Sequence, residues 1–252
     1  MPKDEYIFGF HAVRQVFETD ISRIMELWVD EARHDNKLHA IISQARQQGL
    51  SVQFVPKKTL DKLTQEGHHQ GIVLRCKTST HLKLTLEECL ATLTVPPFLL
   101  VLDEVQDPHN LGACLRTADA TGVHAVIIPK DRSCSLSPTV RKVASGAAET
   151  IPLIEVTNLA RTLRWLQEQK IWLVGTDVHA QTSLFATSLT GPLAVVLGTE
   201  ASGLRRLTRE TCDVLVKIPM QGQIETLNVS VATGVCLYEA FRQRSQVTGG
   251  TK

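Results

Sequence analysis

A polar loop between an apolar strand and an amphipathic helix constrains the fold of this 252-residue chain most strongly. Residues 214–218 form an apolar run typical of a buried strand, and Pro219 and Gly222 then break its periodicity. Asn228 is placed to cap a helix over residues 229–242. Open α/β sheets build ligand sites where a strand ends in such a loop. The alternative is an ordinary βα turn. The number of polar side chains in this one connection disfavours that alternative: Gln221, Gln223, Glu225, Thr226 and Asn228.

The composition is that of a globular protein with enough residues for one large or two small domains. No apolar run is long enough to span a membrane, so we expect no membrane partner. A net charge of +1 neither proposes nor excludes a nucleic-acid partner. The six cysteines are scattered without the spacing of metal ligands. They predict free thiols in a reducing compartment, hence a cytoplasmic protein without a metal.

Strand and helix patterns alternate within about the first 76 residues, which predicts a small α/β domain over residues 1–76. Before Gly71 this unit carries His68, His69 and Gln70 in a polar loop. Two interpretations stay open for the loop: it contacts a ligand, or it is a solvated turn. A double proline ends the segment 77–97, which we interpret as a linker.

A nearly continuous apolar run over residues 98–105 predicts a central parallel strand at the start of a second unit. Asp107 is placed as the cap of the following helix, with Pro108 as its first residue. Arg116 shares a face with the small residues one turn earlier, so its guanidinium is expected to reach toward the helix N-terminus. That direction favours an anionic ligand. The alternative is a surface arginine paired with Asp119.

A further predicted strand, residues 193–197, ends in a glycine-flanked loop over residues 198–204. Glu200 is the only acidic residue in this turn, and a solvated side chain is the ordinary interpretation of such a glutamate. The chain has neither a GxGxxG nor a Walker sequence, so dinucleotide and nucleoside-triphosphate sites lack their phosphate-binding loop.

The three polar loops, 107–116, 198–204 and 218–228, resemble in order and spacing the SpoU family of RNA ribose 2′-O-methyltransferases in the SPOUT superfamily. The first unit is similar to the substrate-binding domain of that family through Gly9-Phe10-His11-Ala12-Val13 and His69-Gln70-Gly71-Ile72. The resemblance implies an α/β fold with a SPOUT-type catalytic domain, a parallel sheet with a trefoil knot, over residues 98–245. A flexible tail over 246–252 is expected to follow.

The resemblance also implies site residues and a methyl donor, S-adenosylmethionine. The implied catalytic residues are Asn110, Arg116, Glu200, Thr226 and Asn228. The implied donor-binding residues are Leu197, Gly198, Thr199, Ile218, Met220 and Leu227. Two positions depart from the family pattern: Thr226 stands where the family has serine, and Ala201 stands where glycine often follows the glutamate. The hydroxyl survives at the first, and alanine is harmless at the second unless φ is positive.

The implied activity is methylation of a guanosine ribose in the peptidyl-transferase region of large-subunit (23S) ribosomal RNA, by a homodimer. A tRNA methyltransferase and a non-catalytic RNA-binding assembly factor are the alternatives, and a nucleotide-dependent oxidoreductase lacks its glycine fingerprint. Candidate RNA contacts in the first unit are His11, Arg14, Lys57, Lys58 and His69. In the second unit they are Arg141, Lys142, Arg205 and Arg206, for which a solvated face is the alternative.

Overall fold

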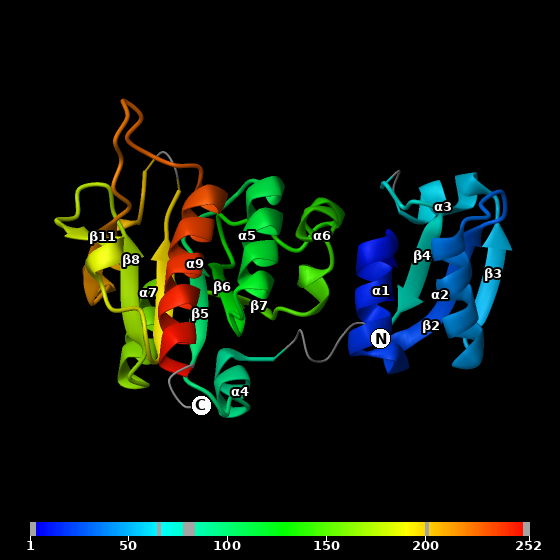
Figure 1. Ribbon diagram of the computed structural model, residues 1–252, viewed down its shortest axis with the longest axis horizontal. Helices are drawn as coiled ribbons and strands as arrows, with labels where there is room; N and C mark the ends of the chain where they lie inside the picture. The colour runs from blue at the N-terminus through cyan, green and yellow to red at the C-terminus, as the bar shows by residue number, and fades with distance from the viewer. Residues whose placement is uncertain (1–3, 65–66, 78–83, 200–201, 249–252) are drawn as a thin grey trace.

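The computed structural model of the protein describes residues 4–64, 67–77, 84–199 and 202–248. It contains two separate sheets, which lie side by side along the long axis of the molecule (Figure 1). The smaller sheet comes from the N-terminal part of the chain, and the larger sheet comes from the remainder. Each sheet has its own core, which supports our proposed division into units 1–76 and 98–245.

The smaller sheet has its strands in the order β1-β4-β2-β3. β2 runs antiparallel to β4 and parallel to β3. Val13 and Ile42, from two helices of this unit, pack with Leu27 and Leu74 of the sheet. The strands are β1 (Glu5–Phe8), β2 (Ile24–Asp30), β3 (Ser51–Val55) and β4 (Ile72–Cys76), and the helices are α1 (Phe10–Thr19), η1 (Ile21–Arg23), α2 (Asn36–Gln47) and α3 (Lys57–Leu63).

The larger sheet has the order β7-β6-β5-β10-β8-β11-β9, and each neighbouring pair is parallel. Its strands are β5 (Phe98–Leu102), β6 (Ala125–Pro129), β7 (Leu153–Val156), β8 (Trp172–Thr176), β9 (Thr182–Ser183), β10 (Leu193–Leu197) and β11 (Val214–Lys217). Its helices are α4 (Leu86–Ala91), α5 (Pro108–Ala120), α6 (Pro138–Ala144), η3 (Ala147–Glu149), α7 (Leu159–Glu168), η4 (Leu184–Ala186), α8 (Arg206–Thr211) and α9 (Val229–Thr248).

Helices cover both faces of the larger sheet. Successive residues of a strand point to opposite faces, so alternate residues of β5 pack into two different cores. Leu100 and Leu102 of β5 pack with residues of α5 and α9 in one core cluster. Leu99 and Val101 of the same strand pack with residues of α4 and α7 in another. A strand buried on both faces must be apolar throughout, which explains the uninterrupted apolar run that predicted β5.

The C-terminal helix α9 returns from β11, the strand next to the edge strand β9, to the middle of the larger sheet, where it lies beside α5 (Figure 1). Its residue Gln243 accepts a hydrogen bond from Leu189 N at 2.8 Å and donates one to Thr187 O at 3.0 Å. The C-terminal half of α9 is therefore fastened to the connection between β8 and β10. This path agrees with the SPOUT-type fold that the resemblance implies.

Most predicted strands and helices are confirmed within a few residues, including the helix cap Asp107. The sequence pattern over residues 137–148 predicts one helix, but α6 stops at Ala144, because Ser145 and Gly146 adopt φ values of 52° and 102°. The sequence patterns also miss α3 and α8, which are short and largely polar.

The segment interpreted as a linker contains α4, whose residues Leu86 and Cys89 pack into the core beneath Leu99. α9 continues through Thr248, into the range expected to be a tail. No helix within the described ranges is both long and apolar enough to cross a membrane.

Candidate functional site

The three loops singled out in the sequence follow β5, β10 and β11 at one edge of the larger sheet, because parallel strands all end on the same side. The first and third loops meet directly: Asn228 Nδ2 donates to Asn110 Oδ1 at 3.1 Å. Asn228 Oδ1 also accepts a hydrogen bond from Ser230 N at 2.9 Å, which confirms the predicted cap of α9. Two predicted catalytic residues that are 118 positions apart thus lie side by side.

Arg116 is exposed on α5, and it makes no ion pair with any residue that the structure describes. The partner considered for it, Asp119, instead accepts a hydrogen bond from Thr150 Oγ1 at 2.6 Å. A guanidinium without a carboxylate partner is available to an anion such as a phosphate.

Gly112 serves the packing of two helices and does not clear a path for Arg116. A Cβ atom on Gly112 would lie 2.6 Å from Val143 Cβ and 2.9 Å from Val140 O, both on α6. Only glycine allows α5 and α6 to approach this closely. The prediction that Gly112 is small in order to give room to the Arg116 side chain is therefore wrong.

The second loop turns so tightly that its first residue must be glycine. A Cβ atom on Gly198 would lie 2.0 Å from the carbonyl oxygen of Gly203, whose own φ is +64°. Thr199 and Gly203 form a β-bridge, with Thr199 N donating at 3.1 Å and Gly203 N at 2.9 Å. The loop thus holds its backbone against the end of β10. The predicted catalytic Glu200, and Ala201, lie outside the described residues.

The second and third loops enclose a cavity of about 720 Å³ at the carboxyl ends of β8, β10 and β11. It is within the roughly 300–1,000 Å³ typical of small-molecule sites. Apolar side chains from the strand ends line it, while Gly198, Gly203 and Gly222 leave backbone accessible. The cavity gathers all six predicted donor-binding residues together with Thr226: Leu197, Gly198, Thr199, Ile218, Met220 and Leu227.

The cavity suits an amphipathic ligand with an apolar ring and polar ends. Val216, Leu197 and Leu227 supply apolar contact, as an adenine ring requires. Asp177 and Arg209 lie at the wall and form an ion pair at 2.8 Å, so both signs of charge are available there. Within the described residues, no group of three His, Cys, Asp or Glu side chains could hold a metal ion.

Arg205 is fastened to Asp103, which follows β5. The Asp103 side chain is fully buried, and its carboxylate accepts hydrogen bonds from Arg205 N at 3.1 Å and Arg205 Nε at 2.7 Å. Arg206 pairs instead with Glu210 on the surface, at 3.1 Å. The prediction that Arg205 contacts RNA phosphate is therefore not supported by its position. Nothing in the local sequence around Asp103 signals this contact.

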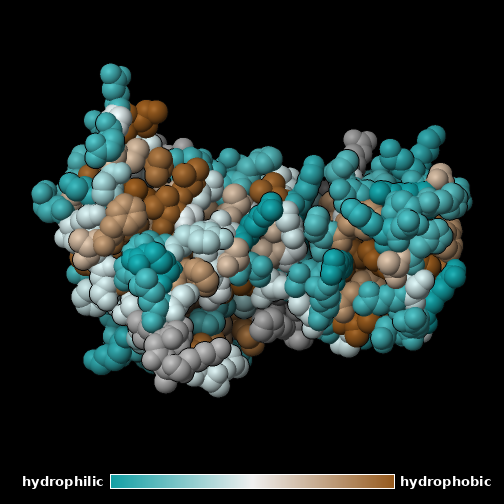
Figure 2. Space-filling model, viewed as in Figure 1, coloured by the Kyte–Doolittle hydropathy of each residue, from teal (hydrophilic) through white to brown (hydrophobic). Residues whose placement is uncertain are grey.

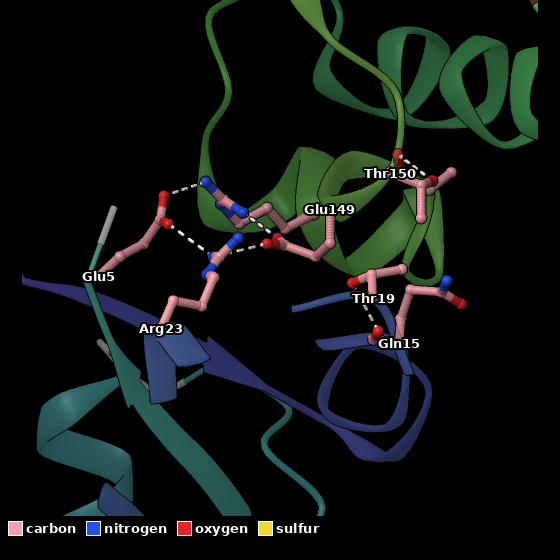
Figure 3. Close-up of polar contacts among 8 residues, drawn as sticks. Glu5, Gln15, Thr19, Arg23, Glu149 and Thr150 are labelled. Carbon is pink, nitrogen blue, oxygen red and sulfur yellow. Dashed lines mark hydrogen bonds and ion pairs between the residues drawn. The ribbon is translucent and has the colours of Figure 1, made fainter. Parts of the chain in front are cut away.

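The two predictions for Arg141, a phosphate contact and a solvated side chain, are not supported by its position. Arg141 belongs to a largely buried ion-pair network between the two units. Arg23 Nη2 lies 3.0 Å from Glu5 Oε2 and 3.0 Å from Glu149 Oε2 (Figure 3). Arg141 pairs with the same two carboxylates. The side chains of Arg23 and Glu149 are only 5% and 1% exposed, so water screens their attraction weakly.

His69 shapes the polar loop of the first unit. Its side chain is buried, Nε2 lies 2.9 Å from Asp61 Oδ1, and Nδ1 accepts from Gly71 N at 3.0 Å. Gln70 Oε1 accepts from Phe10 N at 3.0 Å. Of the two interpretations of this loop, a solvated turn is wrong for His69, and contact between His69 and RNA is not supported. The adjacent His68 is exposed.

Comparison with solved structures defines the class of the fold. A crystal structure of an RNA 2′-O ribose methyltransferase aligns with a TM-score of 0.80 at 27% identity, over 96% of this chain and 89% of that one. The SpoU methyltransferase AviRb from Streptomyces viridochromogenes, solved with the cofactor AdoMet, aligns with a TM-score of 0.80 at 22% identity, over 96% and 91%. The expected SPOUT-type α/β methyltransferase fold is thus confirmed.

Sequence comparison identifies the family. The SpoU rRNA Methylase family matches residues 97–238, and the family described as RNA 2′-O ribose methyltransferase substrate binding matches residues 6–82. The chain therefore belongs to the SpoU rRNA methylase family. A relative from Pectobacterium atrosepticum, named 23S rRNA (guanosine-2′-O-)-methyltransferase RlmB, is 54% identical over 95% of this chain and 98% of its own length.

Proposed function

We propose that this protein transfers a methyl group from S-adenosylmethionine to the ribose 2′-hydroxyl of a guanosine in 23S ribosomal RNA. The observation that carries the proposal is the contact between Asn110 and Asn228, formed by two of the three loops. The second loop, residues 198–204, meets the third loop around the donor-sized cavity. The identity to the RlmB relative over nearly the whole chain supports the reaction and the RNA substrate.

The cavity residues are proposed to bind the donor. Ile218, Met220 and Leu227 would contact it through their backbone, and Gly198 would let it approach the end of β10. When bound, S-adenosylmethionine supplies an electrophilic methyl group on a positively charged sulfonium. The protein is then left with two tasks, positioning the ribose and removing the proton of its 2′-hydroxyl.

Arg116 is proposed to bind phosphate and to lower the pKa of the 2′-hydroxyl through its positive charge. A guanidinium stays protonated in proteins, so it is not itself the base. The hydroxyl proton would pass to Glu200 or to water. Asn110, Thr226 and Asn228 would orient the ribose and the loops by hydrogen bonds, as their amide and hydroxyl groups allow.

We further propose that the protein is a cytoplasmic homodimer. α9 buries Cys236, Leu237 and Ala240 but leaves Tyr238 and Phe241 53% and 44% exposed. These two rings contact each other edge to face at 6.2 Å. Figure 2 shows apolar surface around the start of α9 in the larger unit. Such a stripe is suited to packing against a second copy. Sedimentation of wild type and Tyr238→Lys would test it, with the variant expected to be monomeric.

The test of the proposed function is transfer of radiolabelled methyl to protein-free ribosomal RNA and to tRNA, both from cells that lack this gene. We expect label in 23S RNA, and its loss with Asn228→Ala at unchanged donor binding. Label in tRNA alone would keep the reaction and overturn the substrate. An absence of label in naked RNA and in assembling large subunits, with the donor bound, would favour a non-catalytic assembly factor.

A further inference from the structure

A cleft of about 990 Å³ lies between the two units of the molecule. One wall is formed by α3 and the loop over residues 67–71 of the first unit. The other wall is formed by the start of α5 and by α6. His109, on the second wall, directly precedes Asn110, so this wall adjoins the start of α5, which carries the contact between Asn110 and Asn228.

Each wall presents one lysine to the cleft, Lys57 on α3 and Lys142 on α6. Both side chains are exposed, and neither forms an ion pair within the part of the chain that the structure describes. The cleft also has carboxylates, but they are engaged: Asp61 contacts His69 at 2.9 Å, and Asp30 accepts from Ala32 N at 3.1 Å. Two cations on facing walls are suited to successive phosphates of one chain.

The two walls are held at a fixed separation by the ion-pair network of Arg23, Glu5, Arg141 and Glu149. Arg141 and Lys142 are neighbours on α6, so the buried pair anchors the helix that presents the cleft lysine. α1 adds a second contact, because Gly146 lies so close to Gln15 that a Cβ atom on it would be 3.3 Å from Gln15 Cβ. The cleft is therefore formed before any ligand enters.

The size of the cleft limits which form of RNA it can hold. Its volume is at the upper end of the roughly 300–1,000 Å³ range of small-ligand sites, which is enough for a few unpaired nucleotides. His68 and His109 are exposed on opposite walls, and imidazole rings stack on unpaired bases. Hydrophilic side chains line both sides of the boundary between the units in Figure 2.

We infer that this cleft binds a single-stranded segment of the RNA substrate next to the target nucleotide, with Lys57 and Lys142 contacting phosphates on the two walls. The inference rests on the proposed function, since it takes RNA as the substrate. It makes both units part of one binding surface, and it assigns the recognised RNA to a loop or bulge.

The test replaces Lys57 and Lys142 by glutamine, singly and together, in the full-length protein. Lys37→Gln and Lys170→Gln are matched controls, because these lysines are exposed in the same two units away from the cleft. Binding of a 23S RNA fragment is measured at several salt concentrations, and methyl transfer is measured at subsaturating and saturating RNA. We expect each cleft variant to weaken RNA binding about threefold to tenfold and to reduce the salt slope by about one.

Donor affinity and the rate at saturating RNA should stay as in wild type, which separates RNA binding from catalysis. In a second arm, a complementary oligonucleotide pairs the unpaired strand of the fragment, and binding is expected to fall at least tenfold. Cleft variants that behave like Lys37→Gln and Lys170→Gln, or equal binding of the paired fragment, would overturn the inference. If wild type binds the fragment without methylating any RNA, the proposed function fails, while the salt slopes still decide the cleft.

Discussion

The carboxylate of Asp103 holds Arg205, 102 positions later in the chain, through the backbone N–H and the guanidinium of that arginine. Asp103 follows β5 and Arg205 directly precedes α8, so the contact ties the first loop of the site to the end of the second. Charge-assisted hydrogen bonds to a fully buried carboxylate are among the stronger polar contacts in proteins. We infer that Asp103 is a positioning residue for the loop that begins at Gly198.

Asp103→Asn is expected to weaken donor binding about tenfold, equivalent to about 1.4 kcal/mol. The neutral amide loses the charge that attracts Arg205, and the loop over residues 198–204 loses its anchor. Calorimetric titration with S-adenosylhomocysteine would measure the affinity. Arg206→Gln is the matched control, because this neighbouring arginine pairs with the exposed Glu210 and not with Asp103 among the residues that the structure describes. Equal affinities for the two variants would contradict the positioning role.

Glu149→Gln is expected to destabilise the protein by about 3–5 kcal/mol, because it leaves two guanidiniums close together without one of their shared carboxylates. Urea denaturation would measure the free energy of unfolding. Glu18→Gln, which removes the charge of the exposed partner of Arg14 on α1, should leave the free energy of unfolding nearly unchanged. If the urea midpoint of Glu149→Gln is no lower than that of Glu18→Gln, the ion-pair network contributes little to stability.

Arg116→Lys is expected to lower kcat at least tenfold while donor affinity stays unchanged. Lysine keeps the positive charge but lacks the planar pair of donors that grips a phosphate. Single-turnover methyl transfer would measure the effect, with Arg164→Lys on the exposed face of α7 as the control. Near-normal turnover would exclude a role that needs the guanidinium fork.

The protein is expected to lose stability as the pH rises above about 9. Burial raises the pKa of the thiols of Cys76, Cys212 and Cys236 to about 12 and that of Cys114 to about 11. In the unfolded chain the same thiols ionise near their ordinary value of 9.0. Because the folded pKa values are the higher ones, this contribution is complete below pH 9 and is lost as pH rises toward 12.

The fall should approach about 1.4 kcal/mol per pH unit for each buried thiol. Urea denaturation at pH 8, 9 and 10 would measure it. A Cys236→Ala variant should show a shallower decline than wild type, whatever its stability at pH 8. If the free energy of unfolding falls equally with pH in wild type and in Cys236→Ala, the decline does not come from the buried thiol of Cys236.

Local pattern was sufficient to predict most of the strands and the helix starts. Buried strands such as β5 and β10 are apolar throughout because both faces of the sheet are covered, and Asp107 caps α5 through a bond to His109 N two residues away. The order of the three loops along the chain was enough to indicate the family. Residues 57–63 and 206–211 have neither an uninterrupted apolar run nor a capping side chain, so the local pattern did not predict α3 and α8.

The sequence by itself determined most of the elements, the three site loops and the family, because each depends on residues close together in the chain. Tertiary structure alone decided which charged side chains remain available to RNA. Arg141 and Lys142 are adjacent in sequence, yet one pairs with the buried Glu149 and the other lines the cleft. Arg205 and Arg206 are also adjacent, yet Arg205 pairs with the buried Asp103 and Arg206 pairs with the exposed Glu210. The physical reason is that a charge finds its partner by position in space, and these partners lie up to 136 residues away along the chain.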